Sequence, residues 1–207
     1  MIAIVDYGVG NIFSLSSSLR AIHEEVKLVS DPARLREADK IILPGVGAFA
    51  DAARKLKESG LEEVLLEKCR QGTPLLGICL GMQLLFEESH EYGVTPGLGL
   101  VKGKVVSMVP VVPENYKVPH IGWNELHFPK DKEKSPLFRY VEEGSHVYFV
   151  HSFYGTECEA STIATTEYGA ELTAAVQHGN VFGVQFHPEK SSVVGQKILK
   201  AFCEMGG

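Results

Sequence analysis

The stretch Leu75-Leu76-Gly77-Ile78-Cys79-Leu80-Gly81 joins a short apolar run to a helical pattern, and it decides the predicted fold. Residues 75–78 have the length and composition of a buried central strand, and residues 80–88 are typical of the helix that follows. The glycines beside Cys79 let neighbouring segments approach without a Cβ atom in the way. We expect this junction at the carboxyl edge of a parallel sheet.

Toward the N-terminus, short apolar runs alternate with helical patterns. The expected strands are 2–5, 25–29 and 41–43, with helices from about residue 11 and over 48–58. Asn11 and Asp31 stand where N-caps are expected, and Pro32 follows at a first helical position. This alternation predicts βαβ units and a parallel sheet.

The second half of the chain has shorter β-like stretches separated by Pro and Gly. The expected strands are 101–109, 125–128, 147–150, 162–166, 172–176 and 181–186, with a hairpin turn at 178–180 and an amphipathic helix over 191–205. The prediction is one α/β domain over residues 1–207. Its central, mostly parallel sheet is flanked by helices, and additional antiparallel strands lie in the second half.

Composition narrows the possible functions. The 207 residues are 44% hydrophobic and 22% charged, which fits one large domain with a sizeable core. A net charge of −6 without a Lys/Arg stripe makes nucleic acid a poor partner, and no apolar run approaches the roughly 18 residues of a membrane span. We expect a cytoplasmic protein, because residues 1–6 lack the basic n-region of a signal peptide. We expect no metal or cofactor, because the four cysteines lack CxxC spacing and the remaining histidines lack metal-ligand spacing, with His23 and His90 facing solvent.

Cys79 fits the position of a nucleophile. Gly77-Ile78-Cys79-Leu80-Gly81 matches a nucleophile elbow with Cys in place of Ser. The expected helix after it would favour the thiolate through its dipole. The alternative is that Cys79 is a small buried hydrophobe.

A base for this nucleophile is available near the C-terminus. His187 and Glu189 are two residues apart at the end of an expected strand, so their side chains face the same way. Glu189 would hold the tautomer of His187 while the other ring nitrogen reaches Cys79. The alternative is a surface loop with an incidental His and Glu.

Acyl transfer also needs donors for an oxyanion. The backbone N–H of Leu80, next to the nucleophile, is the first expected donor. The second is expected from Pro44-Gly45-Val46-Gly47, through Val46 or Gly47, because this loop follows the strand 41–43 at the same sheet edge. The alternative is that this loop is an ordinary strand-to-helix turn.

One motif imitates a dinucleotide fingerprint. Gly8-Val9-Gly10 follows the first strand and precedes a helix, with Asp31 about twenty residues on. Phe13 occupies the place of the third glycine. A phenylalanine there would block close packing of helix on strand, which argues against nucleotide binding.

Together these motifs resemble a class I (triad) glutamine amidotransferase, a flavodoxin-like domain, over the whole chain. The resemblance rests on 77–83 (GICLGMQ), 187–189 (HPE) and the PGVG loop, in this order. Within the class, 6–11 (DYGVGN), 119–124 (PHIGWN) and 189–191 (EKS) resemble the glutaminase subunits of imidazole glycerol phosphate synthases.

The resemblance implies a glutaminase that works in a heterodimer. Glutamine would be hydrolysed to glutamate through a thioester at Cys79. Ammonia would pass through a tunnel into a (β/α)8 synthase (cyclase) subunit, which forms imidazole glycerol phosphate and the aminoimidazole carboxamide ribotide in histidine biosynthesis. The alternatives are a glutaminase subunit of another class I amidotransferase and a catalytically silent regulatory subunit.

The resemblance also implies two sets of binding residues. The residues expected to line the glutamine pocket are Gly47, Gln83, Glu91, Ser152 and Phe153. Family members can carry Tyr where Phe153 stands, which removes a possible side-chain hydrogen bond. The residues expected to face the synthase are Asn11, Ile121, Trp123, Tyr148 and Lys190. The alternative is that Trp123 belongs to the core and that Lys190 is a solvated residue at the start of a helix.

Overall fold

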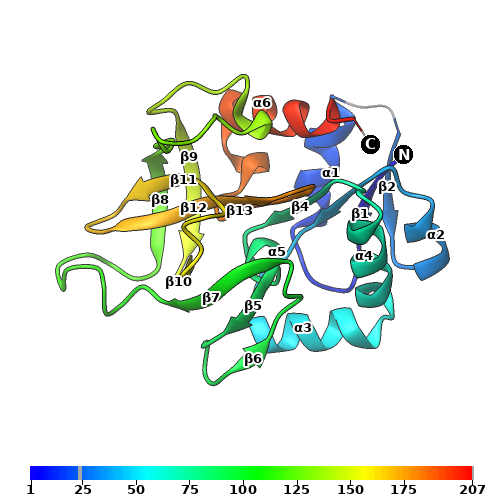
Figure 1. Ribbon diagram of the computed structural model, residues 1–207, viewed down its shortest axis with the longest axis horizontal. Coiled ribbons are helices and arrows are strands. Elements are labelled where there is room, and N and C mark those ends of the chain that lie inside the picture. Colours follow the sequence, from blue (N-terminus) through cyan, green and yellow to red (C-terminus); the bar gives the residue numbers. More distant parts are fainter. Residues whose placement is uncertain (23–24, 207) are drawn as a thin grey trace.

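A seven-stranded sheet runs through the computed structural model, which describes residues 1–22 and 25–206 (Figure 1). Its strand order is β11-β12-β13-β4-β3-β1-β2. The strands are β1 Ile2–Val5, β2 Val26–Val29, β3 Lys40–Leu43, β4 Leu75–Ile78, β11 Thr162–Glu167, β12 Glu171–His178 and β13 Val181–Val184. The five from β2 to β13 are parallel, whereas β12 and β11 are antiparallel. The predicted mostly parallel sheet is confirmed.

Alternating side chains of the parallel strands build two cores, one on each face. Ala3 and Val5 pack with the helices α2 Pro32–Arg36, α3 Phe49–Glu58 and α4 Leu61–Arg70. Ile2 and Ile4 pack with α1 Ile12–Arg20 and α6 Ser192–Cys203 on the opposite face. Each fully buried aliphatic side chain contributes about 1.5–3 kcal/mol. The two cores therefore hold the sheet between helical layers and fix its carboxyl edge.

Two smaller sheets extend the second half. One has the order β10-β7-β5-β6, and the other pairs β8 with β9. The strands are β5 Phe86–Ser89, β6 Thr95–Pro96, β7 Val101–Ser107, β8 His120–Glu125, β9 His146–His151 and β10 Phe153–Thr156. The pairs β10–β7, β8–β9 and β11–β12 are antiparallel, which confirms the predicted additional strands. The predicted hairpin at 178–180 also forms, between β12 and β13.

Helix caps explain two of the boundaries. Asp31 accepts hydrogen bonds from the N–H groups of Ala33 (2.7 Å) and Arg34 (3.0 Å), with Pro32 at the first position. Asn11 occupies the N-cap position of α1, but its side chain makes no capping bond. The predicted cap at Asp31 is confirmed in full, and that at Asn11 in position only.

The predicted helix over 80–88 is wrong beyond its first turn. Helix α5 spans Leu80–Gln83, and the chain then enters β5. Phe86 is fully buried with its ring against Gly155, where an added Cβ would lie 2.3 Å from the ring. Backbone bonds from Leu98 to Leu84 and from Gly99 to Phe86 replace helical ones. Tertiary pairing overrides helix propensity here, so no long helix dipole acts on Cys79.

Two further predictions need correction. The strand expected at 125–128 is β8 His120–Glu125, and beyond it His127 forms only an isolated bridge to Thr165. In β8 the apolar Ile121 and Trp123 alternate with glycine and polar residues, so a search for apolar runs does not find this strand. Phe13 is 83% exposed, so it does not block packing of α1 on the sheet. The argument against a dinucleotide site therefore rests only on the missing glycine.

His23 lies outside the described residues, whereas His90 is partly exposed and bonds Glu88 at 2.7 Å. Within residues 1–22 and 25–206, no helix combines the length and apolar character of a membrane span. In the same ranges, no group of three His, Cys, Asp or Glu side chains is placed to bind a metal ion.

Candidate active site

Cys79 sits on a strained turn between β4 and α5. Its φ is 55° and its ψ is −114°, a conformation that costs a non-glycine residue on the order of 1–3 kcal/mol. Its N–H donates to the Val184 carbonyl at 2.8 Å, which ties the turn to β13. A Cβ on Gly81 would lie 1.8 Å from the Leu43 oxygen, and one on Gly77 2.6 Å from the Gly81 oxygen. The elbow therefore requires both glycines.

His187 follows the end of β13, and Glu189 lies beside it. Nδ1 of His187 is 2.9 Å from Oε1 of Glu189, and both side chains are buried. Burial lowers the pKa of His187, but its hydrogen bonds to Cys79 and Glu189 and their negative charges outweigh burial and raise the pKa to about 9. The site thus favours an imidazolium beside the thiol sulfur.

A cavity of about 370 Å³ opens beside these side chains. Its lining residues are Val46, Gly47, Cys79, Leu80, Gln83, Glu91, Tyr92, Val150, His151, Ser152, Phe153 and His187. Of the catalytic, oxyanion and glutamine-binding residues predicted from the sequence, all but Glu189 line this cavity. Glu189 bonds the far side of the His187 ring. One cavity thus gathers residues from segments spread over 140 positions of the chain.

The loop 44–47 packs directly on the elbow. A Cβ on Gly45 would lie 2.8 Å from the Gly81 nitrogen, and Gly47 has a φ of +93°. The Tyr7 hydroxyl donates to the Pro44 carbonyl at 2.8 Å. Downstream, Phe49 at the start of α3 donates its N–H to Oε2 of Glu91 at 2.7 Å. Leu80 begins α5, so its N–H belongs to a first turn that lacks helical acceptors.

Sequence reasoning missed several residues of the site, among them Gln185, His151 and Tyr7. Gln185 is fully buried and places Nε2 3.9 Å from the Cys79 sulfur. His151 lines the cavity, and burial lowers its pKa to about 4. Burial and the nearby Cys79 charge raise the pKa of Tyr7. A signal existed for Gln185, because it lies two residues before His187 at the end of the expected strand 181–186, and alternate residues of a strand share a face.

Four of the five residues predicted to face a partner lie together. Ile121 and Trp123, on β8, are 59% and 49% exposed, which rules out a core role for Trp123. Trp123 pairs with Tyr148 across the β8–β9 ladder, with ring centroids 6.0 Å apart, and Lys190 Nζ lies 5.8 Å from the Tyr148 ring centroid. Asn11 precedes α1, which contacts the turn Pro188–Lys190. We call Ile121, Trp123, Tyr148 and Lys190 the aromatic face.

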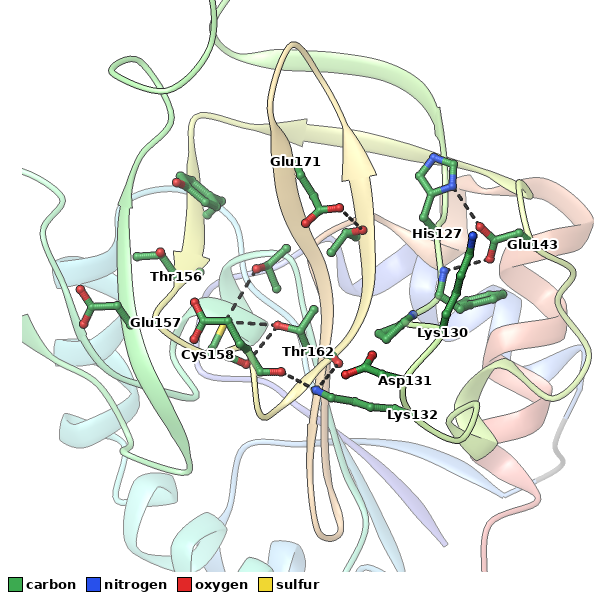
Figure 2. A pocket seen from close by; sticks show the side chains of 17 residues that line it. His127, Lys130, Asp131, Lys132, Glu143, Thr156, Glu157, Cys158, Thr162 and Glu171 are labelled. Atoms are coloured by element: carbon green, nitrogen blue, oxygen red, sulfur yellow. Dashed lines mark hydrogen bonds and ion pairs between the residues drawn. The ribbon is translucent and has the colours of Figure 1, made fainter.

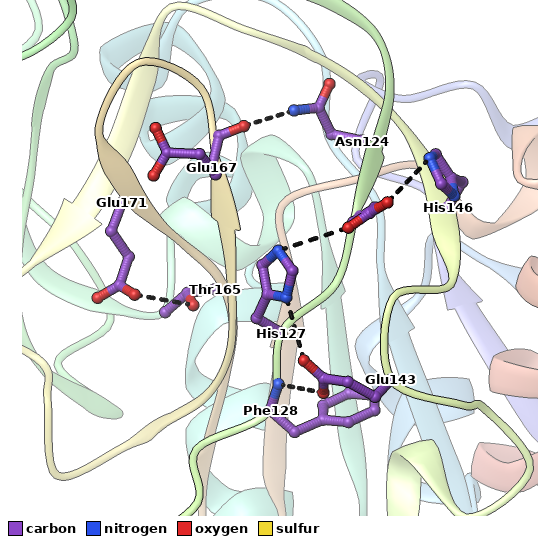
Figure 3. A network of polar contacts seen from close by, with 9 residues as sticks. Asn124, His127, Phe128, Glu143, His146, Thr165, Glu167 and Glu171 are labelled. Carbon is purple, nitrogen blue, oxygen red and sulfur yellow. Dashed lines mark hydrogen bonds and ion pairs between the residues drawn. The ribbon is translucent and has the colours of Figure 1, made fainter.

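A larger cavity, of about 770 Å³, lies away from Cys79 and is lined mainly by polar and charged side chains (Figure 2). Lys132 donates there to backbone carbonyls of Glu159, Ala160 and Thr162. At the rim, Glu143 accepts from the Phe128 N–H at 2.9 Å and bonds His127 at 3.0 Å (Figure 3). None of the predicted site residues lines this cavity, so size alone does not identify the active site.

The other cysteines differ from Cys79 in their surroundings. Burial raises the pKa of Cys69 and of Cys203 to about 11, and it also raises the pKa of Cys158. All three therefore stay protonated near neutral pH. Only Cys79 lies beside a histidine that is itself paired with a carboxylate.

Comparisons with known proteins agree with this geometry. Residues 3–205 match the family model of class-I glutamine amidotransferases. The chain is 50% identical over 208 residues to the imidazole glycerol phosphate synthase subunit HisH of Geobacillus sp. (strain WCH70), covering 99% of this chain and 97% of that protein. It is 45% identical to the HisH subunit of Wolinella succinogenes, with 100% of each chain covered.

Solved structures share the fold at low sequence identity. A structure described as a glutamine amidotransferase matches with a TM-score of 0.75 and 20% identity, covering 99% of this chain and 98% of that one. The PurLQS structure from Thermotoga maritima matches with a TM-score of 0.72 and 20% identity, covering 98% and 96%. The family and the branch that the motifs predicted are confirmed. The chain belongs to the class-I glutamine amidotransferase family, within the branch of the HisH subunits of imidazole glycerol phosphate synthase.

Proposed function

We propose that this chain is the glutaminase subunit of an imidazole glycerol phosphate synthase and that it releases ammonia from glutamine through a thioester on Cys79. The proposal rests on one observation. Cys79, on its strained elbow, lies at the same cavity as the His187–Glu189 pair. The names of relatives that share about half of its residues identify the synthase. Histidine biosynthesis is the pathway that the sequence resemblance implies.

The chemistry follows from the protonation of the pair. The Cys79 thiolate attacks the carboxamide carbon of glutamine, and the imidazolium of His187 gives its proton to the departing nitrogen, so that ammonia leaves. His187 then takes a proton from water, which attacks the thioester and releases glutamate and the thiolate. Glu189 holds Nδ1 of His187 at 2.9 Å, which directs Nε2 toward the reacting atoms.

The negative oxygen of each tetrahedral intermediate needs preorganised donors. The Leu80 N–H is one, and a peptide N–H of Val46 or Gly47 is the proposed second. Tyr7 holds the Pro44 end of the loop, and Glu91 holds the Phe49 end. Between these anchors, Gly45 and Gly47 allow one peptide to rotate. We propose that this rotation completes the oxyanion hole when the synthase binds its ligand.

Glutamine recognition is assigned to residues of the same cavity. The Gln83 amide, the Glu91 carboxylate and the Ser152 hydroxyl are polar side chains of its lining. The Phe153 ring offers no hydroxyl, and it contacts the Tyr92 ring instead, with centroids 6.2 Å apart. Binding of the substrate by Phe153 therefore rests on apolar contact and on its backbone.

The aromatic face is the proposed contact with the (β/α)8 synthase subunit. Tyr148 links this face to the catalytic segment, because its carbonyl accepts the His187 N–H at 2.9 Å. Its own N–H donates to Ser191 Oγ at 3.0 Å, and Ser191 Oγ donates to the His187 carbonyl at 2.6 Å. A partner seated here would lie one hydrogen bond from the base of the reaction.

The test compares glutamine turnover by this chain alone, with the synthase, and with the synthase plus its nucleotide substrate. We expect turnover to rise with each addition, and equal rates in all three would reject the gating step. Cys79→Ala should abolish glutamine turnover while ammonia-dependent synthesis by the partner persists. Retained glutaminase activity in this variant would reject the thioester mechanism, and an inactive wild-type complex would favour a silent regulatory subunit.

A further inference from the structure

Three amide groups form a buried row that ends at the nucleophile. The Gln83 Nε2 donates to the Phe153 carbonyl at 3.2 Å and to Oε1 of Gln185 at 3.0 Å. Nε2 of Gln185 in turn lies 3.9 Å from the Cys79 sulfur. Gln185 is fully buried and Gln83 is nearly so. The mechanism above makes no use of Gln185.

The direction of this row is determined by its far end. A backbone carbonyl can only accept, so the group of Gln83 that faces the Phe153 oxygen must be its NH2. The same NH2 faces Gln185, whose nearer atom must then be the acceptor Oε1. Turning the Gln185 amide over would place two NH2 groups against each other. The row therefore presents an N–H to the sulfur. A thiolate can accept from this N–H, whereas the proton of a thiol would find no acceptor in the row.

The backbone holds Gln185 in this place. Its N–H donates to the Ala174 carbonyl at 2.8 Å, and the neighbouring Val184 carbonyl accepts the Cys79 N–H at 2.8 Å. Gln185 and His187 both follow the end of β13 at Val184, where the chain bends at residues 185 and 186, and both side chains reach the sulfur from there. The sulfur thus has two donors from one short segment, the imidazolium of His187 and the amide of Gln185.

We propose that Gln185 is a positioning residue that donates its amide N–H to the Cys79 thiolate, with its orientation imposed by the Phe153 carbonyl through Gln83. This inference deepens the proposed function and rests on it for its catalytic meaning. A second N–H at the sulfur favours the thiolate over the thiol and fixes the direction of its attack. Hydrogen bonds in a site without substrate are often long and shorten in the reacting complex.

The row also defines what Gln83 offers the substrate. Because both acceptors of its NH2 group are protein atoms, Gln83 meets glutamine through Oε1 alone. It therefore accepts from a donor of the substrate, such as the α-ammonium group, and does not bind the α-carboxylate. A substrate bound to Gln83 is therefore linked to the Cys79 sulfur by hydrogen bonds through the Gln83 and Gln185 side chains.

The test measures how fast iodoacetamide alkylates Cys79 as a function of pH, with peptide mapping to separate it from the other cysteines. Gln185→Met keeps the side-chain volume and removes the donor, and Gln185→Glu keeps the shape and replaces the donor by an acceptor. Gln177→Met is the matched control, since Gln177 bonds Ser135 at 2.7 Å and lies outside the cavity. The urea stability of each variant is measured in parallel.

We expect the apparent pKa of Cys79 to rise by about 0.5–1 unit in Gln185→Met, further in Gln185→Glu, and not at all in Gln177→Met. Gln83→Met, which frees the Gln185 amide to turn, should give a smaller rise. An unchanged pKa in both Gln185 variants overturns the inference, even if their stability falls, since stability alone reports a structural role. Alkylation needs no glutaminase activity, so a shifted pKa in a protein that fails to hydrolyse glutamine would reject only the proposed function.

Discussion

Replacing Cys79 by glycine should make the protein more stable than replacing it by alanine. At an ordinary helical position the reverse holds, because glycine loses more backbone entropy and costs about 1 kcal/mol relative to alanine. At Cys79 the φ of 55° and ψ of −114° impose strain on any residue with a Cβ, of about 2 kcal/mol within the usual range. Glycine removes that strain, which leaves a net advantage of about 1 kcal/mol for Cys79→Gly over Cys79→Ala.

Urea unfolding of the two variants, followed by circular dichroism, measures this difference. Both variants lack the thiol, so their comparison separates backbone strain from lost sulfur contacts. The control is Ala53→Gly in the middle of α3, which should destabilise by about 1 kcal/mol. If Cys79→Gly is as stable as or less stable than Cys79→Ala, the backbone of the elbow stores no strain at Cys79.

Three further predictions concern the elbow, the base and the aromatic face. Gly81→Ala should abolish glutamine turnover and lower the unfolding midpoint, because the added Cβ would lie 1.8 Å from the Leu43 oxygen. Gly206→Ala, with open space around the added Cβ, should do neither. Equal behaviour of the two variants would contradict the packing argument. By NMR, His187 should titrate near pH 9, and Cys79→Ser should lower its pKa, since the attracting thiolate is lost while burial remains. An unchanged titration in Cys79→Ser would show that Glu189 alone sets the pKa. Trp123→Ala should weaken binding to the synthase at least tenfold in calorimetry. Leu28 is an exposed residue on the far edge strand β2, so Leu28→Ala should leave the affinity unchanged. Equal losses of affinity in the two variants would place the interface elsewhere.

The sequence predicts the sheet and the catalytic residues because both follow from local patterns. Short apolar runs alternate with helical periods through the first half, and the elbow glycines mark the tight turn in which Cys79 has a positive φ. Parallel strands bring their carboxyl ends to one edge, so 44–47, 79–80 and 187–189 had to lie together. Knowing which segments end at this edge was enough to place most of the cavity.

Other features depended on contacts that local patterns do not contain. The helix after Cys79 ends at Gln83 because Phe86 finds its place against Gly155, almost seventy residues away. Strand β8 contains no apolar run, because Ile121 and Trp123 alternate with glycine and polar residues, so its position is defined by pairing with β9. Gln185 lies only two residues before His187 in the sequence, yet its role follows only from the amide row that Phe153 orients.

The most direct test of the account is to treat the complex of this chain with its synthase with a glutamine analogue that carries an electrophile in place of the carboxamide, and to map the adduct by mass spectrometry. The account predicts one adduct, on Cys79, that glutamine suppresses by competition. Cys69, Cys158 and Cys203 should remain unmodified, because burial raises the pKa of each thiol. Modification of another cysteine, or none at Cys79 in the complex, would contradict it.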